Sequence, residues 1–166
     1  MKQAISAILV LTVSAAVFIS GCKGKNEPNE PAQPGSGSAA KGQSQTTESN
    51  PEAEKAAIEC AEKWLAVVDQ GEYDKSWEET AGLFKQVVPV EQWRNQLKVF
   101  RGALGKVVSR TLKSKQYTTT APGAPDGQYV IIQYDASFEK KTTAVETITP
   151  MLEEDGAWRV SGYFIK

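Results

Sequence analysis

Residues 89–117, PVEQWRNQLKVFRGALGKVVSRTLKSKQY, decide the fold. Within them the sequence pattern changes from that of a helix to that of a β-strand. Up to residue 104, apolar side chains recur at steps of three and four, which is the spacing of one helix face. They are Val90, Trp93, Leu97, Phe100 and Leu104. Gly105 is expected to end this helix, and Lys106–Tyr117 is predicted to be a β-strand. A helical half of the domain is therefore followed by a sheet half.

Two more helices are expected before residue 89. Asn50 can cap the first, Pro51 suits its first position, and Gly71 stops it. Helical spacing predicts its inner side, made of Ala57, Ala61, Trp64 and Val68. The second helix is expected over residues 73–87, with Trp77, Ala81, Phe84 and Val88 on one side.

Three more strands are expected after a turn-rich loop at residues 122–127. In the first of them, apolar residues alternate with others, which predicts one buried face made of Val130, Ile132, Tyr134, Ala136 and Phe138. The other two are expected over residues 142–152 and 157–165, with the hairpin turn at Asp155-Gly156. The sequence thus predicts an α+β domain in which three helices pack on a curved, four-stranded antiparallel sheet.

Short motifs in a fixed order give the chain a family resemblance. They are Trp64-Leu65, residues 69–73 (DQGEY), Ser76-Trp77, and residues 91–93 (EQW), 104–110 (LGKVVSR), 122–127 (PGAPDG), 144–147 (AVET) and 158–163 (WRVSGY). Through these motifs, residues 55–166 resemble the uncharacterised bacterial family numbered 4019 among the domains of unknown function. The layout also resembles the nuclear-transport-factor-2-like (cystatin-like) cone fold. That fold implies small-molecule sites between helices and sheet, and homodimers through the open sheet face, while the family implies no activity.

The composition divides the chain into three parts. Residues 1–21 contain 14 hydrophobic residues, residues 23–50 contain 3, and residues 51–166 contain 49. The last part is predicted to be a single domain with a net charge of −2, from 15 basic and 17 acidic residues. A nucleic-acid binder needs a basic surface, so we expect no nucleic-acid partner.

The N-terminus is predicted to be an export signal. Lys2 precedes an apolar run over residues 4–19, as in a secretory signal peptide. The segment Ile19-Ser20-Gly21-Cys22 resembles the lipobox of bacterial lipoproteins, with isoleucine in place of the more usual leucine. The resemblance implies cleavage before Cys22 and acylation of that residue. An uncleaved spanning anchor is the alternative, but the run is shorter than the roughly 20 residues that a spanning helix needs.

Residues 22–50 are predicted to be the lipidated cysteine and a disordered tether. Proline, glycine, serine and other polar residues dominate this segment, so it lacks the apolar surface that folding requires. As a flexible coil it would span about 30 Å. Lys23 takes the position where aspartate resembles an inner-membrane retention signal. We therefore expect an exported protein held at the cell membrane by acyl chains, at the outer membrane and facing the periplasm in a Gram-negative organism.

Residue types exclude several chemistries. The chain has no histidine, which removes serine–histidine and cysteine–histidine catalysis and Cys/His zinc sites. Glu153-Glu154-Asp155 offers too few spaced oxygens for a calcium loop. We expect neither a metal nor a cofactor. Cys60 is expected to be a core residue, with a reactive thiol or an intermolecular disulfide as the alternatives.

Strand alternation places several polar residues on the sheet face opposite the apolar one. These candidate ligand contacts are Arg110, Gln133 or Asp135, Glu146 and Arg159. They are expected to form a cross-strand charge ladder, either as a solvated face or as a polar patch that grips an anionic or zwitterionic ligand. The aromatic residues either fill the core or line a pocket between helices and sheet, where Trp93 is a further candidate ligand contact; they are Trp64, Trp77, Trp93, Tyr134, Phe138 and Trp158.

Three functions remain open from the sequence. The leading one is a non-enzymatic binding or scaffolding module for a protein partner or a small amphiphile. The second is an isomerase or hydratase with a carboxylate base and a tyrosine donor. Asp135 cannot share a site with its neighbour Tyr134, because adjacent strand residues point to opposite faces, whereas Glu146 and Tyr163 can meet. The third is a purely structural envelope protein.

The first prediction concerns Cys22, which should take up a clickable fatty acid in cells. Cys22→Ala should abolish labelling, whereas the matched variant Cys60→Ala should keep it. A Cys22→Ala protein that still incorporates the label would rule out acylation at this residue.

Overall fold

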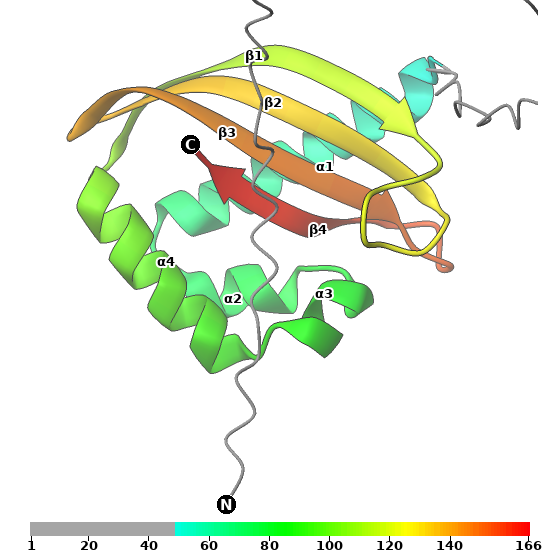
Figure 1. Ribbon diagram of the computed structural model, residues 1–166, viewed down its shortest axis with the longest axis horizontal. Helices are drawn as coiled ribbons and strands as arrows, with labels where there is room; N and C mark the ends of the chain where they lie inside the picture. The colour runs from blue at the N-terminus through cyan, green and yellow to red at the C-terminus, as the bar shows by residue number, and fades with distance from the viewer. Residues whose placement is uncertain (1–48) are drawn as a thin grey trace, which may run out of the picture. The chain divides into compact units, whose positions relative to one another are not determined.

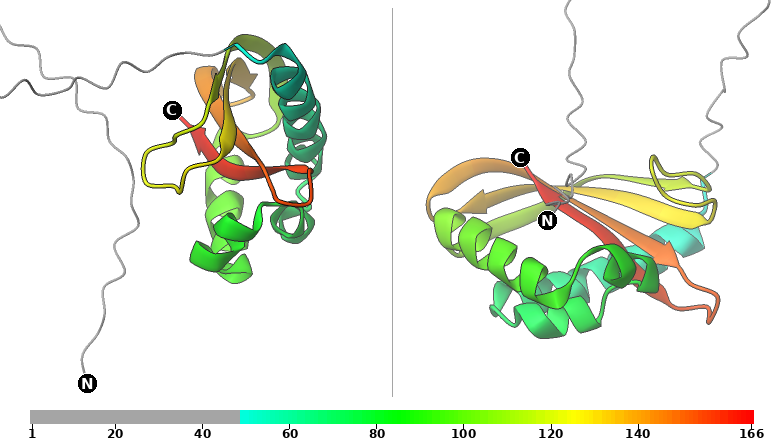
Figure 2. Two further views of the ribbon diagram at one scale, coloured as in Figure 1. Left: turned by 90° about the vertical axis from the view of Figure 1, so that its right-hand side faces the viewer. Right: turned by 60° about the horizontal axis from the view of Figure 1, so that its bottom comes forward.

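The computed structural model describes residues 49–166 and contains four helices and four strands. The helices are α1 (Pro51–Asp69), α2 (Tyr73–Glu78), α3 (Gly82–Val87) and α4 (Val90–Leu104). The strands are β1 (Val107–Thr118), β2 (Gln128–Phe138), β3 (Lys141–Leu152) and β4 (Trp158–Ile165). They form one antiparallel sheet in the order β1-β2-β3-β4, and the helices gather on one side of it (Figures 1 and 2). The predicted α+β class and four-stranded antiparallel sheet are confirmed.

The predicted signal peptide, Cys22 and nearly all of the tether lie outside the described residues. None of the described helices is both long and apolar enough to cross a membrane. The start of α1 is as predicted, because the side chain of Asn50 accepts a hydrogen bond of 3.2 Å from the backbone N–H of Ala53. That bond satisfies one of the free N–H groups at the start of α1.

The prediction of three helices is wrong, because the expected helix over residues 73–87 is broken into α2 and α3. At the break, Thr80 forms a parallel bridge with Val160 of β4, and the Ala81 N–H donates to the Val160 carbonyl at 2.9 Å. The N–H of Gly82 donates to the Glu153 carboxylate at 2.7 Å. These bonds to β4 and its hairpin replace those that an unbroken helix would have made.

Gly105 is the junction between the helical half and the sheet half. Its φ of +77° is in the region that glycine favours, and a Cβ there would lie 2.7 Å from an oxygen of Glu139. The turn between β2 and β3 holds this junction, since the Lys140 N–H donates to the Leu104 carbonyl and the Glu139 N–H to the Lys106 carbonyl, each at 2.9 Å. The end of α4 is therefore fixed to the sheet.

The core lies between the sheet and the helices. The five β2 residues predicted to face inward are all buried, with at most 5% of their surface exposed. The predicted stripe of α4 is correct at Trp93 and Leu97 but wrong at Phe100, which is 60% exposed. Arg101 points inward in its place and is only 6% exposed. A charged side chain therefore enters the interior at this turn of α4.

Candidate functional site

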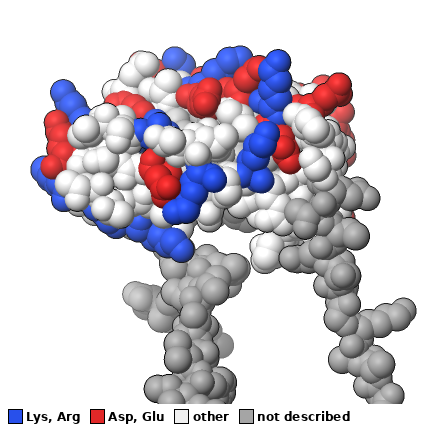
Figure 3. Space-filling view, turned by 90° about the horizontal axis from the view of Figure 1, so that it is seen from above, with Lys and Arg blue, Asp and Glu red and all other residues white. Residues whose placement is uncertain are grey.

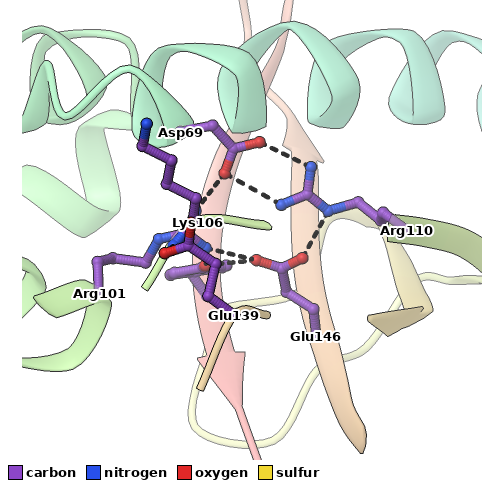
Figure 4. Close-up of polar contacts among 7 residues, drawn as sticks. Asp69, Arg101, Lys106, Arg110, Glu139 and Glu146 are labelled. Carbon is purple, nitrogen blue, oxygen red and sulfur yellow. Dashed lines mark hydrogen bonds and ion pairs between the residues drawn. The ribbon is translucent and has the colours of Figure 1, made fainter. Parts of the chain in front are cut away.

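Four charged side chains meet where the helices approach the sheet (Figure 4). Asp69 comes from the end of α1, Arg101 from α4, Arg110 from β1 and Glu146 from β3. Each arginine contacts both carboxylates, so the four residues close a ring of alternating charge. This cluster is called the charged ring below. It links two helices and two strands that are far apart in the sequence.

The contacts around the charged ring are close. Arg110 donates from Nε to Glu146 at 2.6 Å and from Nη1 to Asp69 at 2.9 Å. Arg101 donates from Nη1 to Glu146 at 3.4 Å and from Nη2 to Asp69. Its guanidinium also lies 5.0 Å from the ring centre of Phe138, within cation–π range.

Burial makes these contacts important for stability. Glu146 is fully buried, and its charge and that of Asp69 balance those of the two arginines. Burial alone would lower the pKa of Arg110, but its hydrogen bonds to Asp69 and Glu146 outweigh this and raise the pKa above its ordinary value. The Arg110 guanidinium therefore keeps its charge. Removing one partner would leave an unpaired charge in the interior. The free-energy cost of that unpaired charge is larger than the net stabilisation that the intact pair provides.

Tyr163 of β4 joins the charged ring at Glu146. Its hydroxyl donates to Glu146 Oε1 at 2.5 Å and accepts from Arg101 at 3.4 Å. Burial, followed by the nearby Glu146 carboxylate, raises the pKa of Tyr163, so the hydroxyl keeps its proton. Glu146 therefore accepts hydrogen bonds from Arg101, Arg110 and Tyr163 together.

Aromatic side chains fill the space beside the charged ring. Trp64 lies 5.1 Å from Tyr163 and 6.0 Å from Trp93 between ring centres, and Phe84 lies 5.2 Å from Trp93. Ser76, which is buried, fixes both indoles: its carbonyl accepts from Trp64 at 2.7 Å and its hydroxyl accepts from Trp93 at 3.0 Å. A groove of about 100 Å³ remains where α4 faces β4. The aromatic residues thus act mainly as core.

The predicted charge ladder does not form. Arg110 and Glu146 do meet, but on the helix-facing side of the sheet, since they pair across the strands with the buried Ala136 and Tyr134. The predicted face was therefore wrong for both. Two register shifts in β1 change the phase of its alternation, and Glu146 continues the buried positions of β3 despite its charge. Its burial is possible because the charged ring neutralises it.

The other predicted ladder residues lie elsewhere. Gln133 is on the opposite face, where it accepts a bond of 3.3 Å from Ser114. Arg159 lies beside the β3–β4 turn and binds Asp155 at 2.7 and 2.9 Å and Glu153 at 2.5 Å. The hydrogen bond from Arg159, followed by one from the Ala157 backbone, lowers the pKa of Asp155 to about 2. Two of the three acidic residues of the turn are therefore paired with an arginine near the start of β4.

Sequence reasoning missed two members of the charged ring, Asp69 and Arg101. A signal existed for each. Arg101 continues the line of Trp93 and Leu97 at steps of four, and Asp69 follows the buried Leu65 by four residues. A charged residue on the buried face of a helix indicates a buried ion pair only when its partner is known. Here the partners come from other elements.

One buried side-chain oxygen or nitrogen in residues 49–166 has no hydrogen-bond partner, the hydroxyl oxygen of Tyr134. Burial, followed by the nearby Glu62 carboxylate, raises the pKa of Tyr134 to about 12. This tyrosine is therefore neutral at physiological pH. Within the same residues, no group of three cysteine or acidic side chains is placed to hold a metal ion.

Cys60 lies at the side of an open hollow of about 520 Å³ between α1, α2 and the start of β4. Its thiol donates to the Trp158 carbonyl at 3.1 Å. Burial raises the pKa of Cys60 to about 11, although nearby Lys63 and Arg159 act in the opposite direction. The expected packing role fits this setting, because the reactive thiolate is disfavoured.

Residues 60–163 match the family described as "Protein of unknown function (DUF4019)". No curated protein matches the chain.

The second prediction concerns the charged ring. Glu146→Gln should lower the free energy of unfolding by about 3–5 kcal/mol, because it leaves the buried Arg101 and the partly buried Arg110 with one carboxylate. The matched control, Asp135→Asn, breaks the exposed pair with Lys113 and should cost at most about 1 kcal/mol. Urea denaturation of both variants measures the difference, and equal losses would contradict the role given to the charged ring.

The third prediction concerns Cys60, tested in a Cys22→Ala chain where it is the only thiol. Raising the thiol pKa from 9.0 to about 11 lowers the thiolate fraction at pH 8 about a hundredfold. Alkylation by iodoacetamide at pH 8 should therefore be about a hundredfold slower in the folded protein than in urea, and it should accelerate as the pH approaches 11. Rapid alkylation of the folded protein at pH 8 would show that the thiol is not held in its neutral form.

Proposed function

The chain belongs to the DUF4019 family of proteins of unknown function, and within it we propose a lipid-anchored binding or scaffolding module of the bacterial cell envelope. In this proposal Cys22 carries the acyl chains, residues 23–50 are the tether, and the domain contacts a protein partner through its surface. The proposal includes the nuclear-transport-factor-2-like cone fold, which the curved sheet with helices on one side supports (Figure 1).

One observation favours a module that acts through its surface over one that holds a small ligand inside the cone. The charged ring and the tryptophans occupy the place between helices and sheet where a cone would hold a small ligand. Glu146 and Tyr163 do meet, as an isomerase would require, at 2.5 Å. A general base needs a free carboxylate beside its substrate. Glu146 is fully buried and accepts from three donors, which favours a structural role.

The surface itself offers an apolar feature. Phe100 of α4 and Phe164 of β4 are 60% and 51% exposed and flank the groove between these elements. These two side chains are called the apolar rim. By contrast, basic and acidic side chains are interleaved over the face seen in Figure 3. Exposed aromatic side chains beside a groove are typical of protein-binding surfaces, so the apolar rim is the proposed contact site.

The fourth prediction tests this site in living cells. A photo-crosslinking amino acid at Phe164 should give adducts at a discrete protein mass, whereas the same amino acid at Glu52, an exposed residue of α1, should give none at that mass. Adducts of equal yield from both positions, or none from Phe164, would contradict a contact through the apolar rim. The homodimer through the sheet face stays a prediction, which sedimentation of the chain tests.

A further inference from the structure

β4 is an edge strand, paired with β3 on one side. At its end, Lys166 and Val145 exchange two backbone hydrogen bonds of 3.1 and 2.9 Å. In an antiparallel pair such bonded positions alternate, and the pairs Phe164–Thr147 and Gly162–Thr149 follow in register. The N–H and C=O groups of Tyr163 and Ile165 are therefore turned away from β3, toward the free edge.

This edge already accepts a backbone partner at its other end. Thr80 bridges Val160 in parallel, and the Ala81 N–H donates to the Val160 carbonyl at 2.9 Å. A short piece of the chain thus acts as the beginning of a fifth strand. Among the described residues, the bridge at Thr80 is the only one on this edge, and the strand continues beyond it for five residues, Ser161–Ile165.

The groove between α4 and β4 lies along this remaining edge. Its lining has no charged side chain and consists of Trp93, Gln96, Leu97, Phe100, Tyr163, Phe164 and Ile165. Its volume of about 100 Å³ is far below that of a typical small-molecule site, about 300 Å³ or more. A charged ligand would lose its hydration here without gaining a partner. The lining therefore favours an uncharged, apolar occupant. Because the groove is small, only part of that occupant can enter it.

We propose that the edge Ser161–Ile165 binds an extended, uncharged segment of a partner protein as an added strand, with an apolar side chain of that segment in the groove. This inference rests on the proposed function and specifies how its partner is bound. The added strand continues the line that Thr80 begins. Backbone groups of Tyr163 and Ile165 supply hydrogen bonds, and the apolar rim supplies side-chain contact.

A single short strand fits this edge better than a second copy of the whole chain. The Thr80 segment ends the available edge at Val160, and α4 lines it from the other side. A symmetric pairing of two β4 edges would bring both copies of α4 and of Thr80 to the same junction. Edge pairing between two copies is therefore not proposed. It is an alternative outcome that the experiment must be able to detect.

The fifth prediction uses the full-length chain and a defined probe. The probe is a fluorescein-labelled, capped pentapeptide of alternating threonine and valine, titrated by fluorescence anisotropy. We expect saturable binding and slower hydrogen exchange of the Tyr163 and Ile165 amides. Ile165→Pro removes one donor that faces the free edge, a position where proline is tolerated, and should weaken binding by about fivefold or more. The matched control Ile165→Ala also loses most of this side chain but keeps the N–H, so it should bind about fivefold or more tightly than Ile165→Pro.

A second comparison does not depend on how the variants fold. The same pentapeptide with N-methylated backbone amides has lost its donors and should not bind. Equal binding of the methylated peptide, equal binding of Ile165→Pro and Ile165→Ala, or no saturable binding would overturn strand addition. A concentration-dependent dimer that Ile165→Pro abolishes would also overturn it, in favour of a second copy. If the crosslink from Phe164 persists while peptide binding fails, the proposed function stands and this inference alone is wrong.

Discussion

The charged ring is the interaction on which the rest of the structure depends. Asp69, Arg101, Arg110 and Glu146 come from four different elements, and Tyr163 adds β4 as a fifth. The cost of burying these charges is large, and only the complete set offsets it. A correct arrangement of α1, α4 and the sheet is therefore the one in which every member finds its partners.

The charged ring also determines which apolar side chains are exposed beside the groove. Neighbouring residues on a helix point about 100° apart. Because Arg101 is held inward by two carboxylates, Phe100 next to it is turned out to solvent beside the groove. Tyr163 is likewise held inward by Glu146, so Phe164 points to the other side of the strand. The apolar rim is thus a consequence of the buried charges.

Local signals predicted the elements that depend on local physics. The cap at Asn50, the stop at Gly105 and the strand over residues 142–152, observed as Lys141–Leu152, each follow from a few neighbouring residues. The break at Thr80 could not be predicted, since it depends on a bridge to Val160, 80 residues away. Nor could the face of Arg110, because register shifts in β1 are set by its pairing with β2. The buried charges required knowledge of partners on other elements.

Native-state hydrogen exchange of the Glu146→Gln variant tests the central claim most directly. If the charged ring holds α4 to the sheet, amides of α4 should lose more protection than those of β2 and β3, because Arg101 is the member that α4 contributes. Wild-type protection throughout α4 in this variant would contradict the account.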